Sequence, residues 1–217
     1  MTQAVRVLLV RHGAFALIDR LLSGEAPGPG LNDEGRRQIG ALAARLRADH
    51  VGQVVTSPLR RAVESARLLA DAVGLSSSVD DDLRDVDYGE WTGRCADDLT
   101  GDPRWHRYNR HRSHMATPGG ESAAQVQARA VDALRRLAAG PGDAAIVAVT
   151  HCDVIRAVAC RCLGLSLDAI TRLTVAAASI TEVHMEAPGL RLVCVNDRAH
   201  LDVPLSRAAP DERCRHA

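Results

Sequence analysis

Apolar residues along this chain follow two patterns: short runs, and stripes with helical spacing. Residues 5–10, 53–56 and 144–149 form short, mostly apolar runs, which is typical of strands buried on both faces of a sheet. Two later runs, 180–185 and 190–195, predict a closing pair of strands.

Between these runs the apolar positions recur every three or four residues. Asn32 predicts the start of one helix, because its side chain can cap the first free N–H groups. Ser57 and Pro58 predict the start of a second helix, with a capping hydroxyl followed by proline in the first turn. Helical stripes over about 122–137 and 153–163 predict two more.

Strands that alternate with helices predict an α/β fold. We expect a three-layer sandwich, with a mostly parallel central sheet and helices on both faces. No repeat or linker divides the chain, so residues 1–217 are expected to form a single domain. Within it, residues 94–120 are a candidate cap or lid insertion.

Composition excludes several classes of function. All 27 basic residues are arginine, so a Schiff-base lysine and a P-loop lysine are both absent. The 27 acidic residues bring the formal net charge to zero, which argues against a nucleic-acid partner. We expect no membrane partner, because no apolar run approaches the length of a spanning helix. Scattered cysteines and the absence of a signal-peptide pattern favour the cytoplasm.

Histidine and arginine residues follow the ends of three predicted strands. Arg11 and His12 end the first run, His151 follows the run at 144–149, and Arg60 and Arg61 follow the run at 53–56. The carboxyl ends of parallel strands meet at one edge of a sheet, where ligands bind. Arginine donors suit phosphate oxygens, and a neutral imidazole can attack phosphorus. The pattern therefore predicts a site for phosphoryl transfer.

Six ordered segments, and a seventh near the end of the chain, resemble a known family. Their order and spacing are similar to those of the histidine phosphatase superfamily, which is also called the phosphoglycerate mutase-like family. The segments are LLVRHG (8–13), LNDEGRRQ (31–38), TSPLRRAVESA (56–66), LRDVDYGEWTG (83–93), PGGES (118–122), VTHCDVIR (149–156) and VNDRAHL (195–201).

The resemblance implies a role for each matching residue. His12 would be the nucleophile that becomes phosphorylated. Arg11 and Arg61 would bind phosphate oxygens, with Arg61 favoured over Arg60 because it directly precedes the alanine of the family's Arg-Ala pattern. His151 would contact the phosphoryl group and stabilise its developing charge.

The general acid implied by the resemblance lies four residues before Gly89, which is Asp85. Many family members carry glutamate there, so the shorter side chain of Asp85 would need a closer backbone or a different substrate pose. Asp87 and Glu90 are the alternatives.

The segment after the nucleophile departs from the family pattern. Residues 14–18 are apolar throughout, where relatives carry polar side chains, and this favours a substrate whose group beyond the phosphate is partly apolar or ring-like. Cys152 stands where glycine commonly follows the second histidine, and a packed side chain is favoured there over a nucleophile. In the loop at 21–30, Ser23 and Gly24 are candidate substrate-binding residues.

The most basic stretch of the chain spans residues 104–114. One interpretation is a solvated helix face whose arginines pair with the acidic residues at 97–102. The other is a lid that attracts an anionic substrate through Arg107, Arg110 and Arg112. Arg107 and Arg110 are therefore candidate substrate-binding residues.

The favoured function is a metal-independent phosphatase that hydrolyses a small phosphorylated metabolite through a phosphohistidine on His12, without a cofactor. A phosphoglycerate mutase-like phosphomutase is the alternative, although such mutases are generally longer. A non-catalytic protein that binds a phosphorylated ligand is the third hypothesis, against which the complete set of Arg11, His12, Arg61 and His151 argues. The oligomeric state stays open, with a homodimer as one option.

Overall fold

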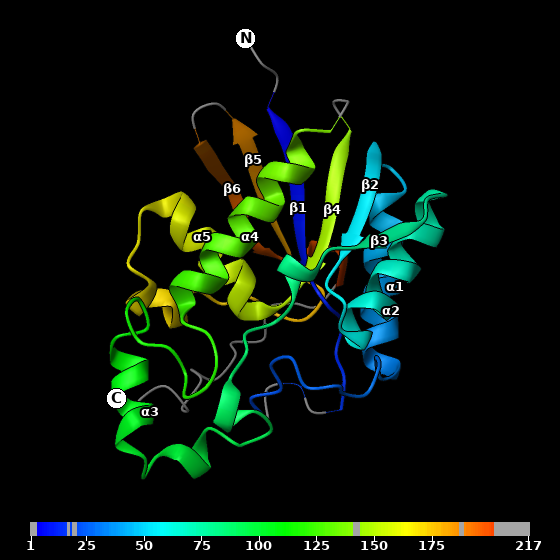
Figure 1. Ribbon diagram of the computed structural model, residues 1–217. Helices are drawn as coiled ribbons and strands as arrows, with labels where there is room; N and C mark the ends of the chain where they lie inside the picture. Colours follow the sequence, from blue (N-terminus) through cyan, green and yellow to red (C-terminus); the bar gives the residue numbers. More distant parts are fainter. Residues whose placement is uncertain (1–3, 17, 19–20, 141–143, 187–188, 202–217) are drawn as a thin grey trace.

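A six-stranded sheet forms the centre of the molecule (Figure 1), with the strand order β3-β2-β4-β1-β5-β6. The computed structural model describes all residues except 1–3, 17, 19–20, 141–143, 187–188 and 202–217. The strands are β1 (Val5–Arg11), β2 (Val51–Thr56), β3 (Ser77–Val79), β4 (Ala145–Thr150), β5 (Ile180–Glu186) and β6 (Gly189–Asp197).

Four neighbouring strands pair in parallel with one another. β4 pairs in parallel with both β1 and β2, and β2 pairs in parallel with β3. β5 and β6 form an antiparallel hairpin that joins the sheet beside β1. The predicted mostly parallel sheet is confirmed.

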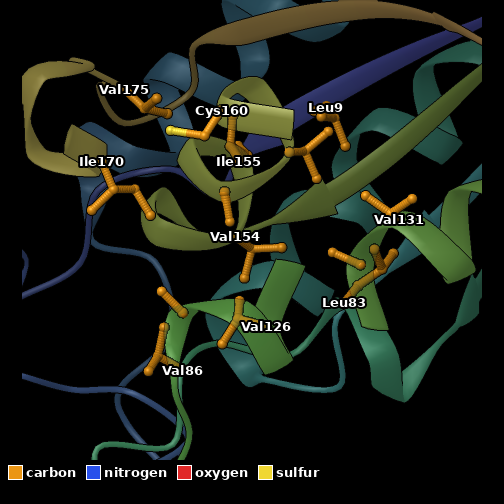
Figure 2. Packing of buried hydrophobic residues seen from close by; sticks show 14 of the residues in the cluster. Leu9, Leu83, Val86, Val126, Val131, Val154, Ile155, Cys160, Ile170 and Val175 are labelled. Carbon is orange, nitrogen blue, oxygen red and sulfur yellow. The ribbon is translucent and has the colours of Figure 1, made fainter. Parts of the chain in front are cut away.

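Helices cover both faces of the sheet and complete the predicted three layers. Leu8 and Val10 of β1 pack into one core with α1 and α2, while Val7 and Leu9 face the opposite core with α4 and α5 (Figure 2). This alternation follows from the two-residue period of a strand. The helices are α1 (Asp33–Leu46), α2 (Arg60–Val73), α3 (Pro103–Arg110), α4 (Ala123–Ala138) and α5 (Cys152–Leu163).

The two predicted helix starts have different outcomes. Asn32 caps α1 as predicted, because its side chain accepts a hydrogen bond from the Gly35 N–H at 2.8 Å. The prediction that α2 begins at Pro58 is wrong, since α2 begins at Arg60 and no side chain caps it. The Ser57 hydroxyl lies instead against His151 at the sheet edge, at 2.7 Å.

The segment between α2 and α4 is largely irregular, with α3 as its one α-helix among the described residues. α3 lies beyond the carboxyl ends of the parallel strands, toward the bottom of Figure 1. The rings of Trp105 and Tyr108 of α3 pack with each other and with Trp91, with centroids 5.3 to 6.1 Å apart. In the described part of the chain, no helix combines the length and the apolar character needed to cross a bilayer.

Candidate active site

The register of β1 against β4 brings His12 and His151 together. Arg11 pairs with Thr150 across the two strands, so each histidine follows a paired position. The His12 N–H donates to the Thr150 carbonyl oxygen at 3.1 Å. The two imidazole rings lie 5.1 Å apart between centroids, and both are buried.

The partner of the His12 ring determines which nitrogen carries the proton. Nδ1 lies 2.9 Å from the Gly13 carbonyl oxygen, which can only accept a hydrogen bond, so the proton of a neutral ring is on Nδ1. Nε2 then carries the lone pair. Burial holds the pKa of His12 well below its usual value, and the neighbouring His151 ring and the charges of Arg11 and Arg61 lower this pKa further. His12 is therefore a neutral imidazole at neutral pH, with Nε2 available as a nucleophile.

The turn that carries His12 is held by two helices on one side of the sheet. The Gly13 N–H donates to the Ser65 hydroxyl of α2 at 3.1 Å. The Ala14 N–H donates to Gln38 Oε1 of α1, also at 3.1 Å. A Cβ atom added to Gly13 would lie 2.6 Å from the Gly35 carbonyl oxygen, so only glycine allows α1 to approach this closely. These contacts fix the ring before any ligand binds.

Arg60 and Arg61 point in opposite directions from the start of α2. The Arg60 side chain is 68% exposed and pairs with Glu64 at the surface. The Arg61 side chain is 2% exposed, and its Nη2 donates to the Gly24 carbonyl oxygen and to Asp85 Oδ2, each at 2.8 Å. Among the described residues, Nε of Arg61 has no hydrogen-bond partner. Arg61 therefore brings a buried positive charge and a donor to this edge of the sheet.

Arg11 adds a second buried positive charge. Its side chain leaves the end of β1, and Nη1 donates to the Val175 carbonyl oxygen at 2.8 Å. Arg11 and Arg61 both lower the pKa of His12, which places their charges within electrostatic reach of the ring. Two buried guanidinium groups beside a neutral imidazole suit an anion with several oxygens.

His151 and Asp85 contact each other within this cluster of buried side chains. Nε2 of His151 lies 2.7 Å from the Ser57 hydroxyl, and its Nδ1 lies 3.5 Å from Asp85 Oδ2. Burial holds the pKa of His151 well below its usual value, and the charges of Arg61, Arg11 and Arg129 lower it further. Oδ1 of Asp85 accepts from the Val86 N–H at 2.9 Å. His151 is thus neutral, beside a carboxylate that already contacts Arg61.

The alternative acids are engaged elsewhere. Oδ1 of Asp87 accepts from the Gly89 N–H at 2.8 Å within its own turn. Glu90 is exposed and pairs with Arg104 at 3.0 Å. Of the three carboxylates, the contacts with Arg61 and His151 are made by Asp85.

Of the two candidates in the loop at 21–30, Gly24 is the one whose contact with the cluster is shown. The Gly24 carbonyl oxygen accepts from Arg61. Gly24 has a φ of +45°, and a Cβ atom there would lie 2.5 Å from the Val86 carbonyl oxygen, so the position requires glycine. The Ser23 hydroxyl oxygen is buried and has no partner among the described residues. The role of Ser23 in substrate binding stays a prediction, whereas Gly24 contacts Arg61 directly.

Comparison with known proteins agrees with this geometry. The sequence model of the histidine phosphatase superfamily (branch 1) matches residues 7–198. The chain belongs to this superfamily. It is 36% identical over 197 residues to a bifunctional protein of Mycobacterium tuberculosis, in an alignment that covers 87% of the chain and 53% of that relative. The chain therefore spans about half the length of this relative.

Two other relatives match over nearly their whole length. A probable phosphoglycerate mutase of Yersinia enterocolitica is 30% identical over 208 residues, which covers 92% of this chain and 96% of that protein. The solved structure of a mycobacterial glucosyl-3-phosphoglycerate phosphatase is 28% identical, with a TM-score of 0.78, and covers 89% of this chain and 99% of that one. The histidine phosphatase fold thus extends over most of the chain.

In this member of the superfamily, the apolar segment after His12 brings one aromatic ring close to that histidine. Phe15 is buried, and its ring centroid lies 5.5 Å from that of His12. The guanidinium carbon of Arg61 lies 5.3 Å from the same ring. Ala16 is exposed, and Leu17 lies outside the described residues. Phe15 therefore provides the apolar contact beside the nucleophile.

Cys152 follows His151 but does not have the properties of a nucleophile. Burial raises the pKa of its thiol to about 11, and Sγ lies 3.5 Å from the Val175 carbonyl oxygen. A thiol that stays protonated near neutral pH is a poor nucleophile. These contacts favour a packed side chain.

The basic stretch at 104–114 divides into paired and unpaired arginines. Arg107 and Arg110 line an open hollow of about 570 Å³ on α3, together with Gly101, Pro103, His106 and His111. This hollow includes neither His12 nor His151. Assigning Arg112 to the same basic surface was wrong, because Arg112 is buried, lies 3.8 Å from Asp153 and stacks over Tyr108.

Ser57 is a site residue that the sequence did not identify. Its hydroxyl holds the His151 ring, whereas the sequence assigned it to a helix cap. A signal was present, because Ser57 directly follows a third strand that ends at the same edge as β1 and β4. A polar residue in that position can reach a ligand or a site residue as readily as a helix terminus.

Proposed function

We propose that this protein is a metal-independent phosphatase that hydrolyses a small phosphorylated metabolite through a phosphohistidine on Nε2 of His12. One observation carries the proposal: the Nδ1 contact with the Gly13 carbonyl leaves the Nε2 lone pair of a neutral, buried imidazole in a pocket with two buried arginines. This arrangement suits nucleophilic attack on a phosphate ester.

The chemistry follows from the positions of the side chains. Nε2 of His12 attacks phosphorus while the bond from phosphorus to the alcohol oxygen breaks. Arg11, Arg61 and the single N–H of neutral His151 stabilise the charge on the phosphoryl oxygens. Asp85 gives a proton to the departing alcohol oxygen as the bond from that oxygen to phosphorus breaks.

Hydrolysis of the phosphohistidine reverses the role of the acid. Asp85 takes a proton from a water molecule, whose oxygen attacks phosphorus as the bond to Nε2 breaks. Inorganic phosphate leaves, and His12 and Asp85 return to their first states. The polar side chains around His12 come from arginine, histidine and one aspartate. This aspartate, Asp85, is already paired with Arg61. Such a set suits an anion rather than a divalent cation.

The Phe15 ring supports a substrate that is partly apolar or ring-like beyond the phosphate, because the ring adds an apolar surface beside His12 and Arg61. A phosphomutase is the second candidate, supported by the 30% identity to a probable phosphoglycerate mutase. The two differ in what attacks the phosphohistidine: water in one case and a second hydroxyl of the bound alcohol in the other.

The decisive experiment is hydrolysis of para-nitrophenyl phosphate by the wild type and by His12→Ala. We expect release of inorganic phosphate in the presence of EDTA, an acid-labile phosphoenzyme, and loss of both in His12→Ala, because Nε2 forms the covalent bond. Arg60→Ala is the matched control and should keep the wild-type rate, since Arg60 is exposed and faces away from the pocket.

Other outcomes identify the competing functions. Phosphate release that depends on added metal would contradict the proposal. Exchange between phosphate isomers without release of phosphate would establish the mutase. Binding of phosphate without a phosphoenzyme would indicate a non-catalytic binding protein.

A further inference from the structure

One guanidinium group holds the backbone that carries Asp85. Arg129 lies on α4, and its side chain is 9% exposed. Its Nη1 donates to the carbonyl oxygens of Asp82 and Arg84 at 2.8 and 2.7 Å, and its Nη2 donates to that of Asp85 at 2.8 Å. A single side chain thus satisfies three carbonyl groups in four consecutive residues.

Glu121 joins this arginine to the far side of Asp85. Its carboxylate accepts from Nε and Nη2 of Arg129, each at 2.9 Å. It also accepts from the Arg84 side chain and from the Asp87 N–H, each at 3.2 Å. Burial tends to raise the pKa of Glu121, but the hydrogen bonds and charge of Arg129 outweigh it and hold this pKa below its usual value. Glu121 is therefore an ionised partner that bridges both flanks of Asp85.

Such support is needed because Asp85 belongs to no strand or helix. His12 and His151 follow strand ends, whose positions the sheet fixes. Asp85 lies between two short 3₁₀ turns, Asp81–Leu83 and Gly89–Trp91, where no ladder of backbone hydrogen bonds sets its position. The aspartate side chain is also short, so any movement of its backbone moves the carboxyl group directly.

We propose that Arg129 and Glu121 are positioning residues for proton transfer by Asp85. The pair holds the backbone of residues 82–87 at the distance from which the carboxyl group reaches the leaving-group oxygen. The inference rests on the proposed function, in which Asp85 is the general acid. A displacement of about 1 Å at a catalytic group can cost about 100-fold in rate, so this backbone contact bears on catalysis.

The same helix supplies a matched control. Arg136 also contacts this segment, but it does so at the surface, through the side-chain carboxylates of Asp80 at 3.2 Å and Asp82 at 2.7 Å. Within the described part of the chain, its hydrogen bonds to this segment go to side-chain carboxylates and not to backbone carbonyl groups, and its side chain is 53% exposed. Arg136→Gln removes a charge of the same sign from the same helix without releasing the backbone of Asp85.

The test compares two leaving groups by kcat/KM, which covers the steps up to departure of the alcohol. Para-nitrophenolate leaves without protonation, whereas the alkoxide of butyl phosphate needs an acid. In both Asp85→Asn and Arg129→Gln, kcat/KM should fall much further for butyl phosphate than for para-nitrophenyl phosphate. In Arg129→Gln, the loss on butyl phosphate should exceed the loss on para-nitrophenyl phosphate by about 10- to 100-fold. Arg136→Gln should leave the ratio of the two at the wild-type value.

Arg129→Lys separates position from charge. The charge of Arg129 contributes to lowering the pKa of His151, and lysine keeps this charge but cannot span three carbonyl groups and a carboxylate. We expect the leaving-group effect to persist in Arg129→Lys. Recovery of the wild-type ratio in this variant would overturn the inference, as would an equal loss on both substrates in Arg129→Gln.

Two further measurements keep the outcomes distinct. Circular dichroism melting shows whether Arg129→Gln folds. If it does not, Glu121→Gln tests the same contact, and we expect its leaving-group effect on kcat/KM to have the same direction and a smaller size. A wild-type ratio in Glu121→Gln would then overturn the inference. If Asp85→Asn lacks the leaving-group effect, the proposed acid is wrong. If Asp85→Asn shows it and the Arg129 variants do not, only the positioning role fails.

Discussion

At the scale of single residues, the site depends on two imidazoles that stay neutral in a positively charged pocket. His12 and His151 are fully enclosed, and burial together with Arg11 and Arg61 lowers both pKa values. A protonated ring here would add a third buried positive charge. In the proposed mechanism, the environment that suits a phosphate anion therefore also keeps His12 in its reactive, neutral form.

This environment makes the stability of the fold depend on pH. In the unfolded chain both histidines bind protons below about pH 6.5, whereas in the folded protein they do not. The free energy of unfolding should thus fall as the pH falls below about 6.5, by about 1.4 kcal/mol per pH unit for each histidine. Urea unfolding at pH 7.5, 6.5 and 5.5 measures the slope. His12→Gln should have a shallower slope than the wild type, and an equal slope would contradict the assignment.

The sequence could predict which residues meet at the site. His12, Arg61 and His151 follow the ends of strands, and the register of a parallel sheet brings these ends together. The proton position on His12 could not be predicted, because its partner is the carbonyl oxygen of the next residue. The role of Arg129 could not be predicted either, because the sequence of an amphipathic helix does not indicate which carbonyl groups its arginines will contact.

At the scale of elements, α1 packs against the turn that carries the nucleophile without an intervening side chain. A Cβ atom added to Gly35 would lie 2.0 Å from the Ala14 carbonyl oxygen. From the sequence, a glycine in the first turn of a helix indicates only a weaker helix. The close approach depends on where the turn after β1 lies, which is set by tertiary packing and not by local pattern.

Gly35→Ala should push α1 away from this turn. We expect a loss of about 1 to 3 kcal/mol in the free energy of unfolding, together with lower activity, because the contacts of Ala14 with α1 would change. Gly40→Ala is the control on the same helix, where nothing lies within 4 Å of the added atom, and it should stabilise the protein by about 0.5 to 1 kcal/mol. Chemical unfolding and para-nitrophenyl phosphate hydrolysis measure both effects, and similar behaviour of the two variants would refute the contact.

At the scale of the whole molecule, a chain with no net charge carries an uneven distribution of charge. Arg104 pairs with Asp102 and Arg112 lies beside Asp153, while Arg107 and Arg110 form no ion pair among the described residues. The sequence predicted the basic stretch and its helix but not this division, because pairing depends on which side of α3 each side chain occupies. The layered architecture was predictable from alternating patterns, and the strand order was not.

The unpaired charges should act on substrate capture at long range. If α3 attracts anions, the double variant Arg107→Ala/Arg110→Ala should lower kcat/KM by about tenfold at low ionic strength, with a smaller effect as salt increases. Arg104→Ala removes a charge from the same helix that is already neutralised, and it should have little effect. Steady-state kinetics across a salt series tests this, and an unchanged kcat/KM in the double variant at low salt would argue for a solvated helix face.

The pairing of Arg11 with Thr150 has a consequence for how this chain can vary over evolution. Strand interiors of this kind exchange one aliphatic residue for another at modest cost. A single inserted or deleted residue in β1 or β4, however, would shift one histidine by about 3.3 Å along the strand and turn it to the opposite face of the sheet. These two segments can therefore drift in composition while their lengths stay constant.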